Sequence, residues 1–471
     1  MRLNRVVAAA FVIVALPASG QTTNDPFATP IVADEGIIRV DFREFATIPD
    51  MDGAAARMML LVDEPGTRRL FVNDMRGPLY GVSYDGRTVI EYVNIDDPRW
   101  AMDVESSGRE RGFQSFAFHP QFNIPGSPGY GKFYTWSDVT DTSPAADFTP
   151  TGEGDTHDTV LLEWTAQDAT ATTYDGARPR ELFRVQQPFG NHNGGHISFN
   201  PLASQGDEDF GLLYIGNADG GSGGDPMNMA QNPASAFGKI LRVDPLGSNA
   251  TNGKYGIPAT NPFVSGGPPG VLGEIWALGL RNPQRFEWDP ANGSMYVADI
   301  GQNIVEELSP VTAGANLGWN VWEGSFRYAS RAGVETGNAR GDASMTFPVA
   351  EYDHRDPILS GRSAVTGVVV YRAAAIPQLR GRILFGDMPT GEIFHVSADD
   401  PPAGGQAPIR RLLFNDGGEP TTLLQLIQAK NREQGKEPAS RTDLRFGLGP
   451  DQQVFILNKH DGTIRVIAPA G

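Results

Sequence analysis

The chain has 471 residues, of which 40% are hydrophobic and 20% charged, with 56 glycines, 36 prolines, no cysteine and a formal net charge of −18. This composition is too apolar for a disordered chain and too polar for a protein with many membrane spans, and the negative charge argues against nucleic acid as a partner. The absence of cysteine excludes disulfides and thiolate metal sites, whereas the surplus of carboxylates suits a hard cation such as calcium.

The first 20 residues have the pattern of a signal peptide. Arg2 and Arg5 give a positive start, residues 6–16 form a short apolar run, and small residues precede Gln21 as a cleavage site. The apolar run is too short to span a bilayer, and no other stretch reaches about 18 apolar residues. We therefore expect a periplasmic or secreted protein that does not insert into a membrane, with residues 21–35 as a polar leader.

One local pattern recurs along the rest of the chain: a short apolar strand, a polar or glycine-containing turn, and a second strand. The six instances are residues 70–72 with 79–82, 133–135 with 160–162, 213–215 with 240–243, 295–297 with 307–308, 383–385 with 392–394, and 454–456 with 463–466. Their spacing is irregular and longer than in the common short propeller repeats, as expected for β-blades with long connecting loops.

Six such units, together with the many turns that the glycines and prolines require, predict an all-β protein. We expect a six-bladed β-propeller over residues 36–471 as a single domain, because a closed ring leaves no long sheet edges exposed. Two β-sandwich domains are the alternative, but they would require a break in composition near the middle of the chain, and none is visible. The one amphipathic helical pattern, over residues 419–433, predicts a surface helix.

Two histidines lie close together in residues 190–196, which read Gly-Asn-His-Asn-Gly-Gly-His. The intervening Asn-Gly-Gly argues against the helix on which His192 and His196 would form a metal-binding pair. A loop of this composition brings backbone close to a ligand, so His192 is a candidate general base. An ordinary hydrogen-bonded turn histidine is the alternative.

A glycine-rich acidic segment, residues 215–226, directly follows one of the predicted strands. It lacks the lysine or helix start of a phosphate-binding loop. We expect it to place the carboxylate of Asp219 either on a cation or beside His192.

Two further segments contain candidate binding residues. In residues 277–284, Pro283 biases Asn282 towards an extended conformation, and Arg281 presents a guanidinium suited to a carboxylate or quinone oxygen, with a surface salt bridge as the alternative. Residues 299–307 combine acidic side chains with turn carbonyls, as a calcium site does, with a solvated acidic turn as the alternative.

The order of these motifs resembles the glucose/sorbosone dehydrogenase family, the soluble quinoproteins that include aldose sugar dehydrogenases. The matching segments are residues 110–120, 191–195, 219–221, 238–244, 280–284, 299–307 with 314–319, 365–367 with 370–372, and 384–387. Each motif is weak alone, but their common order covers residues 36 to 468.

The resemblance implies a six-bladed propeller that holds pyrroloquinoline quinone (PQQ) and calcium and oxidises a sugar at its anomeric hydroxyl, with a separate electron acceptor. It implies that His192 removes the hydroxyl proton and that Asp219 orients His192 and stabilises its cationic form. Calcium, as a Lewis acid, would polarise the quinone carbonyl.

The same resemblance assigns binding residues. Those implied for the cofactor are Glu110, His192, Arg281, Asn282, Gln284 and Arg362. The backbone carbonyls of Gly301 and Gln302 match the ligands of the cofactor calcium. A second, structural calcium is matched by Glu307 with Glu306 and the Leu317 carbonyl.

The chain also departs from the family pattern. Glu110 replaces a glutamine, His196 replaces an arginine, Arg362 is the nearest cation to the expected lysine, and a basic pair is replaced around residues 387–391. Because some relatives with this fold are binding ectodomains, a glycan- or protein-binding propeller is one alternative function. A calcium-dependent hydrolase such as a lactonase is another.

Overall fold

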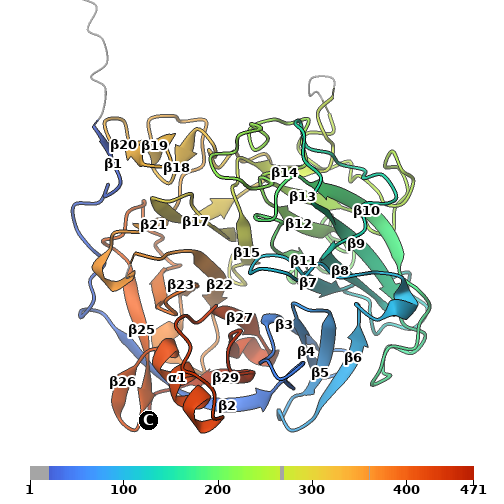
Figure 1. Ribbon diagram of the computed structural model, residues 1–471, viewed down its shortest axis with the longest axis horizontal. Coiled ribbons are helices and arrows are strands. Elements are labelled where there is room, and N and C mark those ends of the chain that lie inside the picture. The colour runs from blue at the N-terminus through green and yellow to red at the C-terminus, as the bar shows by residue number, and fades with distance from the viewer. Residues whose placement is uncertain (1–20, 266–269, 360) are drawn as a thin grey trace, which may run out of the picture.

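The computed structural model describes residues 21–265, 270–359 and 361–471. Twenty-nine strands and one α-helix lie in this part of the chain, arranged as a ring of sheets (Figure 1). The predicted signal peptide, residues 1–20, lies outside the described residues. No helix in the described part is long and apolar enough to cross a membrane.

The strands form six four-stranded antiparallel blades, which confirms the predicted six-bladed propeller. In order from the innermost strand outwards, blade 1 is β3 (Met58–Glu64), β4 (Arg69–Asp74), β5 (Pro78–Ser83) and β6 (Val89–Asn94); blade 2 is β7 (Phe113–Phe118), β8 (Lys132–Val139), β9 (His157–Thr165) and β10 (Arg180–Gln187). Blade 3 is β11 (Ile197–Phe199), β12 (Leu213–Asn217), β13 (Lys239–Val243) and β14 (Ile275–Leu278); blade 4 is β15 (Pro283–Trp288), β16 (Met295–Asp299), β17 (Val305–Val311) and β21 (Ala350–Asp353). Blade 5 is β22 (Val365–Tyr371), β23 (Arg382–Asp387), β24 (Ile393–Ser397) and β25 (Arg410–Asp416); blade 6 is β27 (Arg445–Leu448), β28 (Val454–Leu457), β29 (Thr463–Ala468) and β2 (Ile38–Thr47).

All six strand pairs predicted from the sequence are the second and third strands of a blade, and each pair is antiparallel. These middle strands are the most continuously apolar because neighbouring blades cover both of their faces. The sequence pattern therefore located the centre of every blade.

The ring is closed by a strand from the opposite end of the chain. β2 pairs antiparallel with β29, with Asp41 opposite Ala468, and so becomes the outermost strand of blade 6. Its first residues also pair parallel with β25 of blade 5. Closure joins the two ends of the chain in one sheet and covers what would otherwise be an exposed edge.

The hydrophobic core is divided among the interfaces between blades. Six clusters of buried apolar side chains correspond to the six interfaces between consecutive blades, including the one between blades 6 and 1. Aromatic rings fill the interface between blades 1 and 2, where Phe133 stacks on Trp164 with ring centroids 5.8 Å apart. Each blade is therefore stabilised by both of its neighbours, as in the packing of two sheets face to face.

A recurring carboxylate fixes the loops at one end of the ring. We call the end at which the innermost strands begin the upper end. There, the aspartate at or near the end of the second strand accepts a backbone N–H from the loop that enters the innermost strand of the same blade. The pairs are Arg57 N–H to Asp74, Gly112 N–H to Asp138, Arg281 and Asn282 N–H to Asp299, and Ala364 N–H to Asp387.

The remaining elements are peripheral. A small sheet of β1 (Thr22–Thr23), β18 (Trp322–Glu323), β19 (Phe326–Ser330) and β20 (Gly333–Glu335) lies beside blade 4, and four single 3₁₀ turns span Pro98–Trp100, Pro357–Leu359, Pro377–Leu379 and Pro450–Gln452. β1 belongs to the expected polar leader, residues 21–35, and further along that segment the Ile31 N–H donates to Asp356 at 2.7 Å. The leader is therefore bound to the body of the protein.

The one α-helix, α1, spans Leu423–Glu433 and begins later than the sequence pattern predicted. Residues 419–421 form β26 (Glu419–Thr421), which pairs with β25. Thr422 then caps the helix in a capping box with Gln425. The helical pattern was correct, but pairing with a neighbouring strand displaced its first turn.

His119 provides a test of stability at the lower end of the ring. Its ring packs against Phe199, its Nδ1 accepts the Gln121 N–H at 3.1 Å, and burial lowers the pKa of His119 to about 4. Because an unfolded histidine has a pKa of about 6.5, the unfolded chain takes up this proton first as the pH falls. The free energy of unfolding should therefore fall between about pH 6.5 and pH 4, by at most about 3 kcal/mol from this residue.

The variant His119→Asn retains an acceptor for Gln121 and cannot titrate. Urea unfolding of both proteins at about pH 7 and about pH 4.5 should show a smaller loss of stability in the variant. Equal losses in the two proteins would contradict this account of His119.

Candidate functional site

The residues singled out by sequence meet at the upper end of the ring. His192 precedes the innermost strand of blade 3, Asp219 follows the second strand of that blade, and Arg281 precedes the innermost strand of blade 4. They are far apart along the chain, but blade geometry brings their loops to one mouth. The Asp219 N–H donates to the Arg281 carbonyl at 2.8 Å, which joins the loops of the two blades directly.

His192 is held by contacts on its backbone and its ring. Its φ of +55° lies in the left-handed region, which is uncommon for a residue with a side chain and recurs at functional sites. Its N–H donates to Glu110 Oε2 at 2.9 Å, and its Nδ1 lies 2.7 Å from Asp219 Oδ1. Since an ionised Asp219 can only accept, Nδ1 carries the proton and Nε2 is the nitrogen that can accept one.

Asp219 is buried, with 1% of its surface exposed, and every contact favours its charged form. Burial by itself would raise the pKa of Asp219, but His192, Arg281 and the Gly221 N–H together hold it below the ordinary value. The second carboxylate oxygen accepts the Trp319 indole N–H at 2.8 Å. The arrangement can orient an imidazole and stabilise it when it becomes protonated.

A buried lysine anchors the loop that carries Asp219. Lys239 Nζ donates to the carbonyls of Met229, Ala230 and Phe237 at 2.6–2.9 Å, and burial lowers the pKa of Lys239 to about 7. These three bonds hold the far side of the loop against the start of β13. The position of Asp219 therefore depends on the protein interior and not on the loop alone.

Arg281 and Asn282 are fixed through their backbone, which leaves part of each side chain available. Both N–H groups donate to Asp299, at 2.9 and 2.7 Å. The Arg281 guanidinium donates from Nη1 to the Ile300 carbonyl at 2.9 Å and lies 5.6 Å from the centroid of the Trp319 ring. Its Nε is buried without a hydrogen-bond partner among the described residues.

Glycine is required where His192 approaches blade 4. A Cβ on Gly195 would overlap the carbonyl of Pro283, and a Cβ on Gly194 would overlap the Trp136 ring. The Gly-Gly step therefore lets the loop of blade 3 lie directly on β15. This explains the glycines of the motif by close packing.

The turn between β16 and β17 of blade 4, residues 300–304, is held by backbone and side-chain contacts. Glu323 Oε1 accepts the N–H groups of four consecutive residues, 302–305, at 2.8–3.1 Å, while its Oε2 is buried without a partner among the described residues. The Gln302 side chain accepts the Gly224 N–H, and the Gly301 N–H donates to Glu306. These bonds tie the turn to the loop that carries Asp219.

Glu306 and Glu307 point to opposite faces of β17 and have different partners. Glu306 binds His354 Nε2 at 2.7 Å and the Val365 N–H at 2.8 Å, whereas Glu307 accepts the Gly324 N–H at 2.6 Å. Adjacent residues of a strand alternate in this way, so the two carboxylates do not face one ion. Leu317 donates its N–H to the Leu278 carbonyl of blade 3.

Three carboxylates lie in a row across blade 4. Asp299 is opposite Glu307 in β16 and β17, and Glu307 is opposite Glu351 in β17 and β21. Burial raises the pKa of Asp299 to about 7, and burial with the neighbouring charges of Asp299 and Glu351 raises the pKa of Glu307 well above its usual range. In the described part of the chain, however, no three His, Asp or Glu side chains converge in a geometry that holds a metal ion.

The other predicted cofactor residues lie at the upper end of their blades. Gln284 is buried in β15, and its Oε1 has no partner among the described residues. Arg362 is exposed in the loop that enters β22, where its N–H donates to the Leu359 carbonyl. His196, the second histidine of the motif, turns away from His192 towards Ser115 and Phe286.

Sequence reasoning gave no role to Trp319, Glu323 or His354, although all three bind predicted site residues. Trp319 ends a segment, residues 314–319, that was matched only as a motif. The other two lie in the insertion of blade 4 and just after β21, where no local pattern marks them. A side chain that forms hydrogen bonds to a distant loop, as these do, leaves no recognisable pattern in the sequence around it.

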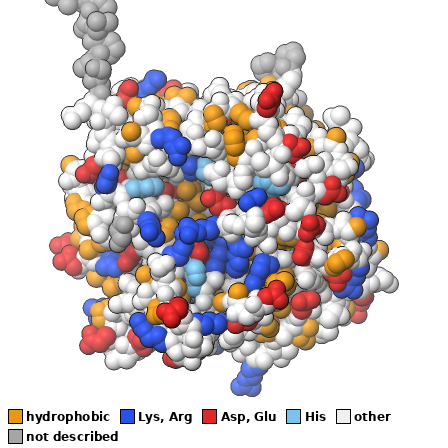
Figure 2. All heavy atoms as spheres, in the orientation of Figure 1, with side chains coloured by type: hydrophobic (Ala, Val, Ile, Leu, Met, Phe, Trp, Pro, Cys, Tyr) orange, Lys and Arg blue, Asp and Glu red, His pale blue; other side chains and the backbone are white. Residues whose placement is uncertain are grey.

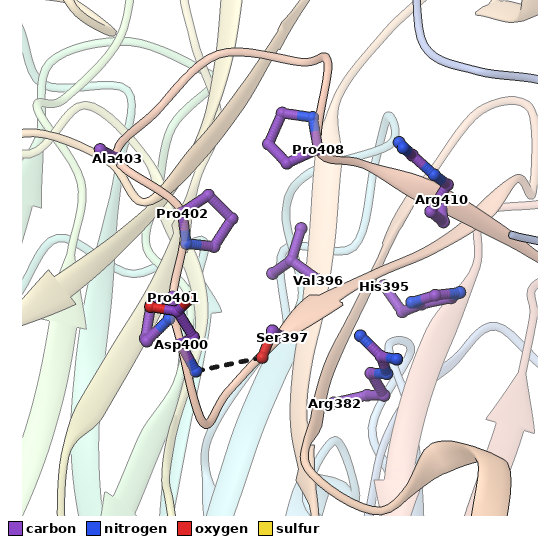
Figure 3. A pocket seen from close by; sticks show the side chains of 10 residues that line it. All are labelled: Arg382, His395, Val396, Ser397, Asp400, Pro401, Pro402, Ala403, Pro408 and Arg410. Carbon is purple, nitrogen blue, oxygen red and sulfur yellow. Dashed lines mark hydrogen bonds between the residues drawn. The ribbon is translucent and has the colours of Figure 1, made fainter.

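Two cavities lie away from the residues that meet at the upper end of the ring. One of about 600 Å³ is lined by the later residues of all six innermost strands, which shows that these strands run in the same direction around a common axis. The other, of about 490 Å³, lies at the lower end of blade 5, where Figure 3 shows Arg382, His395 and Arg410 on one side and three prolines on the other. None of the predicted site residues lines the second cavity.

Comparison with known proteins decides the family. Residues 64–412 match the family described as glucose/sorbosone dehydrogenase. The chain belongs to this family. The match confirms the resemblance inferred from the order of the motifs.

Individual relatives of the family share different parts of the chain. The HIPL1 protein of Arabidopsis thaliana is 32% identical over 369 residues, which cover 71% of this chain and 51% of that protein. The Hedgehog-interacting protein of Homo sapiens is 27% identical over 228 residues, covering 48% of this chain and 29% of that protein. The chain thus spans about half the length of the first curated relatives it matches, or less.

A solved structure shares the fold. The PQQ-bound aldose sugar dehydrogenase of Streptomyces coelicolor superposes with a TM-score of 0.56 at 19% identity, covering 90% of this chain and 96% of that one. This likeness supports the fold described above.

The pairing of His192 with Asp219 predicts a specific tautomer. In the native protein, ¹⁵N NMR of labelled histidine should show His192 protonated at Nδ1. In Asp219→Asn, the amide can donate to Nδ1, and the proton should move to Nε2. An Nε2 proton in the native protein, or no change in the variant, would contradict the assigned geometry.

Proposed function

We propose that this protein is an exported sugar dehydrogenase that uses PQQ and calcium to oxidise an aldose at its anomeric hydroxyl. The observation that carries the proposal is the buried pair of His192 and Asp219 with Arg281 bonded to the same loop. Membership of the glucose/sorbosone dehydrogenase family and the PQQ-bound relative support it.

The residues at the mouth fit an anionic quinone. Arg281 Nε is a buried donor without a partner among the described residues, and quinone or carboxylate oxygens are the acceptors that a guanidinium binds best. Asn282 and Gln284, which follow Arg281 closely in the sequence, are also buried and contribute further amide groups. The same three residues would hold the cofactor in our proposal.

The donors on blade 4 fit a hard cation in their chemistry. Glu323 Oε2 is buried without a partner among the described residues, and burial raises the pKa values of Asp299 and Glu307, so a bound cation would favour their charged forms. Carboxylate and carbonyl oxygens are the ligands that calcium prefers. We therefore propose the carbonyls of Gly301 and Gln302 as ligands of the cofactor calcium, and Glu307 as a ligand of the second, structural calcium.

The chain's own residues provide acid–base catalysis. His192 accepts the hydroxyl proton at Nε2, and Asp219 stabilises the imidazolium that results. Trp319 and Gly221 keep Asp219 ionised and oriented. When bound, PQQ supplies the two-electron acceptor, and calcium supplies Lewis-acid polarisation.

The proposal is tested by adding PQQ and calcium to purified apoprotein. Binding should appear in an absorbance titration, and an aldose should then reduce an artificial dye. With PQQ at saturating concentration, His192→Ala should lower kcat by about 10²–10⁴-fold, the contribution typical of a general base. The matched control is His119→Asn, which alters a buried histidine at the lower end of the ring and should retain activity.

Two results would overturn the proposal: no binding of PQQ to the native protein, or equal turnover by the native protein and His192→Ala. Failure of binding in the native protein alone would direct attention to the second candidate function.

A binding propeller is the second candidate. Its motivation is that Arg362 is exposed and that residues 388–390, Met-Pro-Thr, carry no positive charge where the family has a basic pair. One matched human protein is named Hedgehog-interacting protein, and this name describes the binding of a protein partner. Retained glycan or protein binding by His192→Ala, with no turnover by the native protein, would favour it.

A calcium-dependent hydrolase stays the third candidate. Of the acidic side chains that suggested it, Asp219 binds His192 and Trp319, Asp225 accepts the N–H groups of Met229 and Ala230, and Glu306 binds His354.

A further inference from the structure

The cavity at the lower end of blade 5 has basic side chains along one wall. Arg382, at the start of β23, lies opposite Ser397 at the end of β24, and Arg410, at the start of β25, lies opposite His395. Side chains that lie opposite one another, or two residues apart on a strand, share a face of the sheet. These four side chains therefore share one face of blade 5, and Figure 3 shows the two guanidinium groups on either side of the His395 ring.

The two guanidinium groups of this wall lack a carboxylate partner. Among the described residues, no carboxylate oxygen lies within 4.0 Å of a charged nitrogen of Arg382 or Arg410. Asp400 lines the same cavity without pairing with either of them. By contrast Arg411, which follows Arg410 in β25, pairs with Glu392 at 2.8 Å. The cavity wall thus carries two positive charges that only one carboxylate, at a greater distance, offsets.

His395 is the buried polar group of the wall. It is 3% exposed, and neither of its ring nitrogens has a hydrogen-bond partner among the described residues. Burial and the positive charges of Arg382 and Arg410 lower the pKa of His395 to about 4, and the nearby Gly36 backbone opposes this only in part. Buried polar groups in proteins are nearly always hydrogen-bonded, because leaving one unpaired costs free energy. An anion bound between the two arginines would offset both the missing bond and the repulsion.

Several donors of the wall remain available to such an anion. The Arg382 guanidinium has no hydrogen-bond partner in the described part of the chain, and Arg410 uses only its Nη1, which donates to two backbone carbonyls of the preceding loop at 2.6 and 2.9 Å. Ser397 Oγ accepts the Asp400 N–H at 3.1 Å, drawn as a dashed line in Figure 3, so its hydroxyl proton is left to donate.

The N-terminal leader holds the basic wall in place. Gly36 has a φ of +62°, and a Cβ at this position would lie 2.9 Å from Arg410 Cδ. Arg411 Nη1 donates to the Ala33 carbonyl at 3.3 Å. The leader therefore lies directly against the Arg410 side chain, so that ordering this arginine costs a ligand little.

Prolines form the opposite wall of the cavity. Pro401, Pro402 and Pro408 all come from the connection between β24 and β25, residues 398–409. The proline ring fixes φ, so this wall is stiff as well as apolar. The volume of about 490 Å³ lies within the range of about 300–1,000 Å³ that is typical of sites for small molecules.

We propose that this cavity binds a small molecule through a phosphate or sulfate group, which Arg382, Arg410 and Ser397 hold beside His395. A tetrahedral oxyanion of this kind has several acceptor oxygens, and a guanidinium binds two of them through parallel hydrogen bonds. The prolines would contact the remainder of the ligand. The site lies at the opposite end of the ring from His192, so the proposal stands independently of the dehydrogenase function proposed above.

The test is isothermal titration calorimetry of the full-length protein with three probes: inorganic sulfate, inorganic phosphate and glucose 6-phosphate. Arg382→Met should weaken the binding of all three by about tenfold or more, because it removes a hydrogen bond between charged groups. Arg382→Lys keeps the charge and should bind more tightly than Arg382→Met. Added sodium chloride should narrow the difference between the native protein and Arg382→Met.

The matched control is Arg380→Met. Arg380 is an exposed arginine two residues before Arg382 and does not line the cavity, so its variant has the same change of charge and should bind the probes as the native protein does. Glucose without a phosphate separates this site from sugar binding elsewhere, because its binding should not depend on Arg382. Thermal unfolding shows that each variant is folded.

A second measurement observes the site directly. In ¹⁵N NMR of labelled histidine, saturating sulfate should raise the pKa of His395 from about 4, because a bound anion stabilises the imidazolium. Asp400 is the other group of the cavity wall that titrates at low pH, and Asp400→Asn should retain the sulfate-dependent rise.

The outcomes decide between the sources of the oxyanion. Tighter binding of glucose 6-phosphate than of inorganic phosphate, lost in Arg382→Met, would support a larger ligand that carries the group. Equal binding of all three probes would overturn the larger ligand. Native-like binding by a folded Arg382→Met, Arg410→Met double variant, an unchanged pKa of His395 in sulfate, or no binding of any probe to the native protein would overturn the site itself.

Discussion

The pairing of β2 with β29 is the constraint on which the rest of the structure depends. It joins residues 38–47 to the last strand of the chain and completes blade 6. Without it, blade 6 would have an open edge. Because the ring is closed, all six innermost strands point the same way around one axis, and the loops that enter them open at a single mouth.

Within this frame, a repeated carboxylate holds the entrance loops of four blades in place, and the pair of His192 and Asp219 is a variation on it. In blades 1, 2, 4 and 5 an aspartate at the end of the second strand accepts a backbone N–H from its own entrance loop. In blade 3 that position is Asn217, and Asp219, two residues later, binds the side chain of His192. A device that fixes loops elsewhere thus orients an imidazole here.

Blade 4 holds a row of buried carboxylates, Asp299, Glu307 and Glu351. Arg281 lies at the entrance of the same blade and donates its backbone N–H to Asp299. Figure 2 shows the charged side chains on the face of the ring in view. A cation coordinated by oxygen atoms would stabilise the charged forms of these carboxylates, which is the physical requirement behind the calcium proposal.

The sequence by itself determined the all-β class, the central hairpin of every blade and three residues that meet at the mouth of the ring, His192, Asp219 and Arg281. These are local properties: alternating apolar strands, turns rich in glycine, and motifs of a few residues. Only the tertiary structure decided that β2 closes the ring, that α1 begins at Leu423, that Glu306 and Glu307 face apart, and that Trp319 and Glu323 reach the mouth. The reason is physical, because each of these depends on which distant strand or loop lies alongside, and that is set by closure and packing of the whole ring and not by any short stretch of chain.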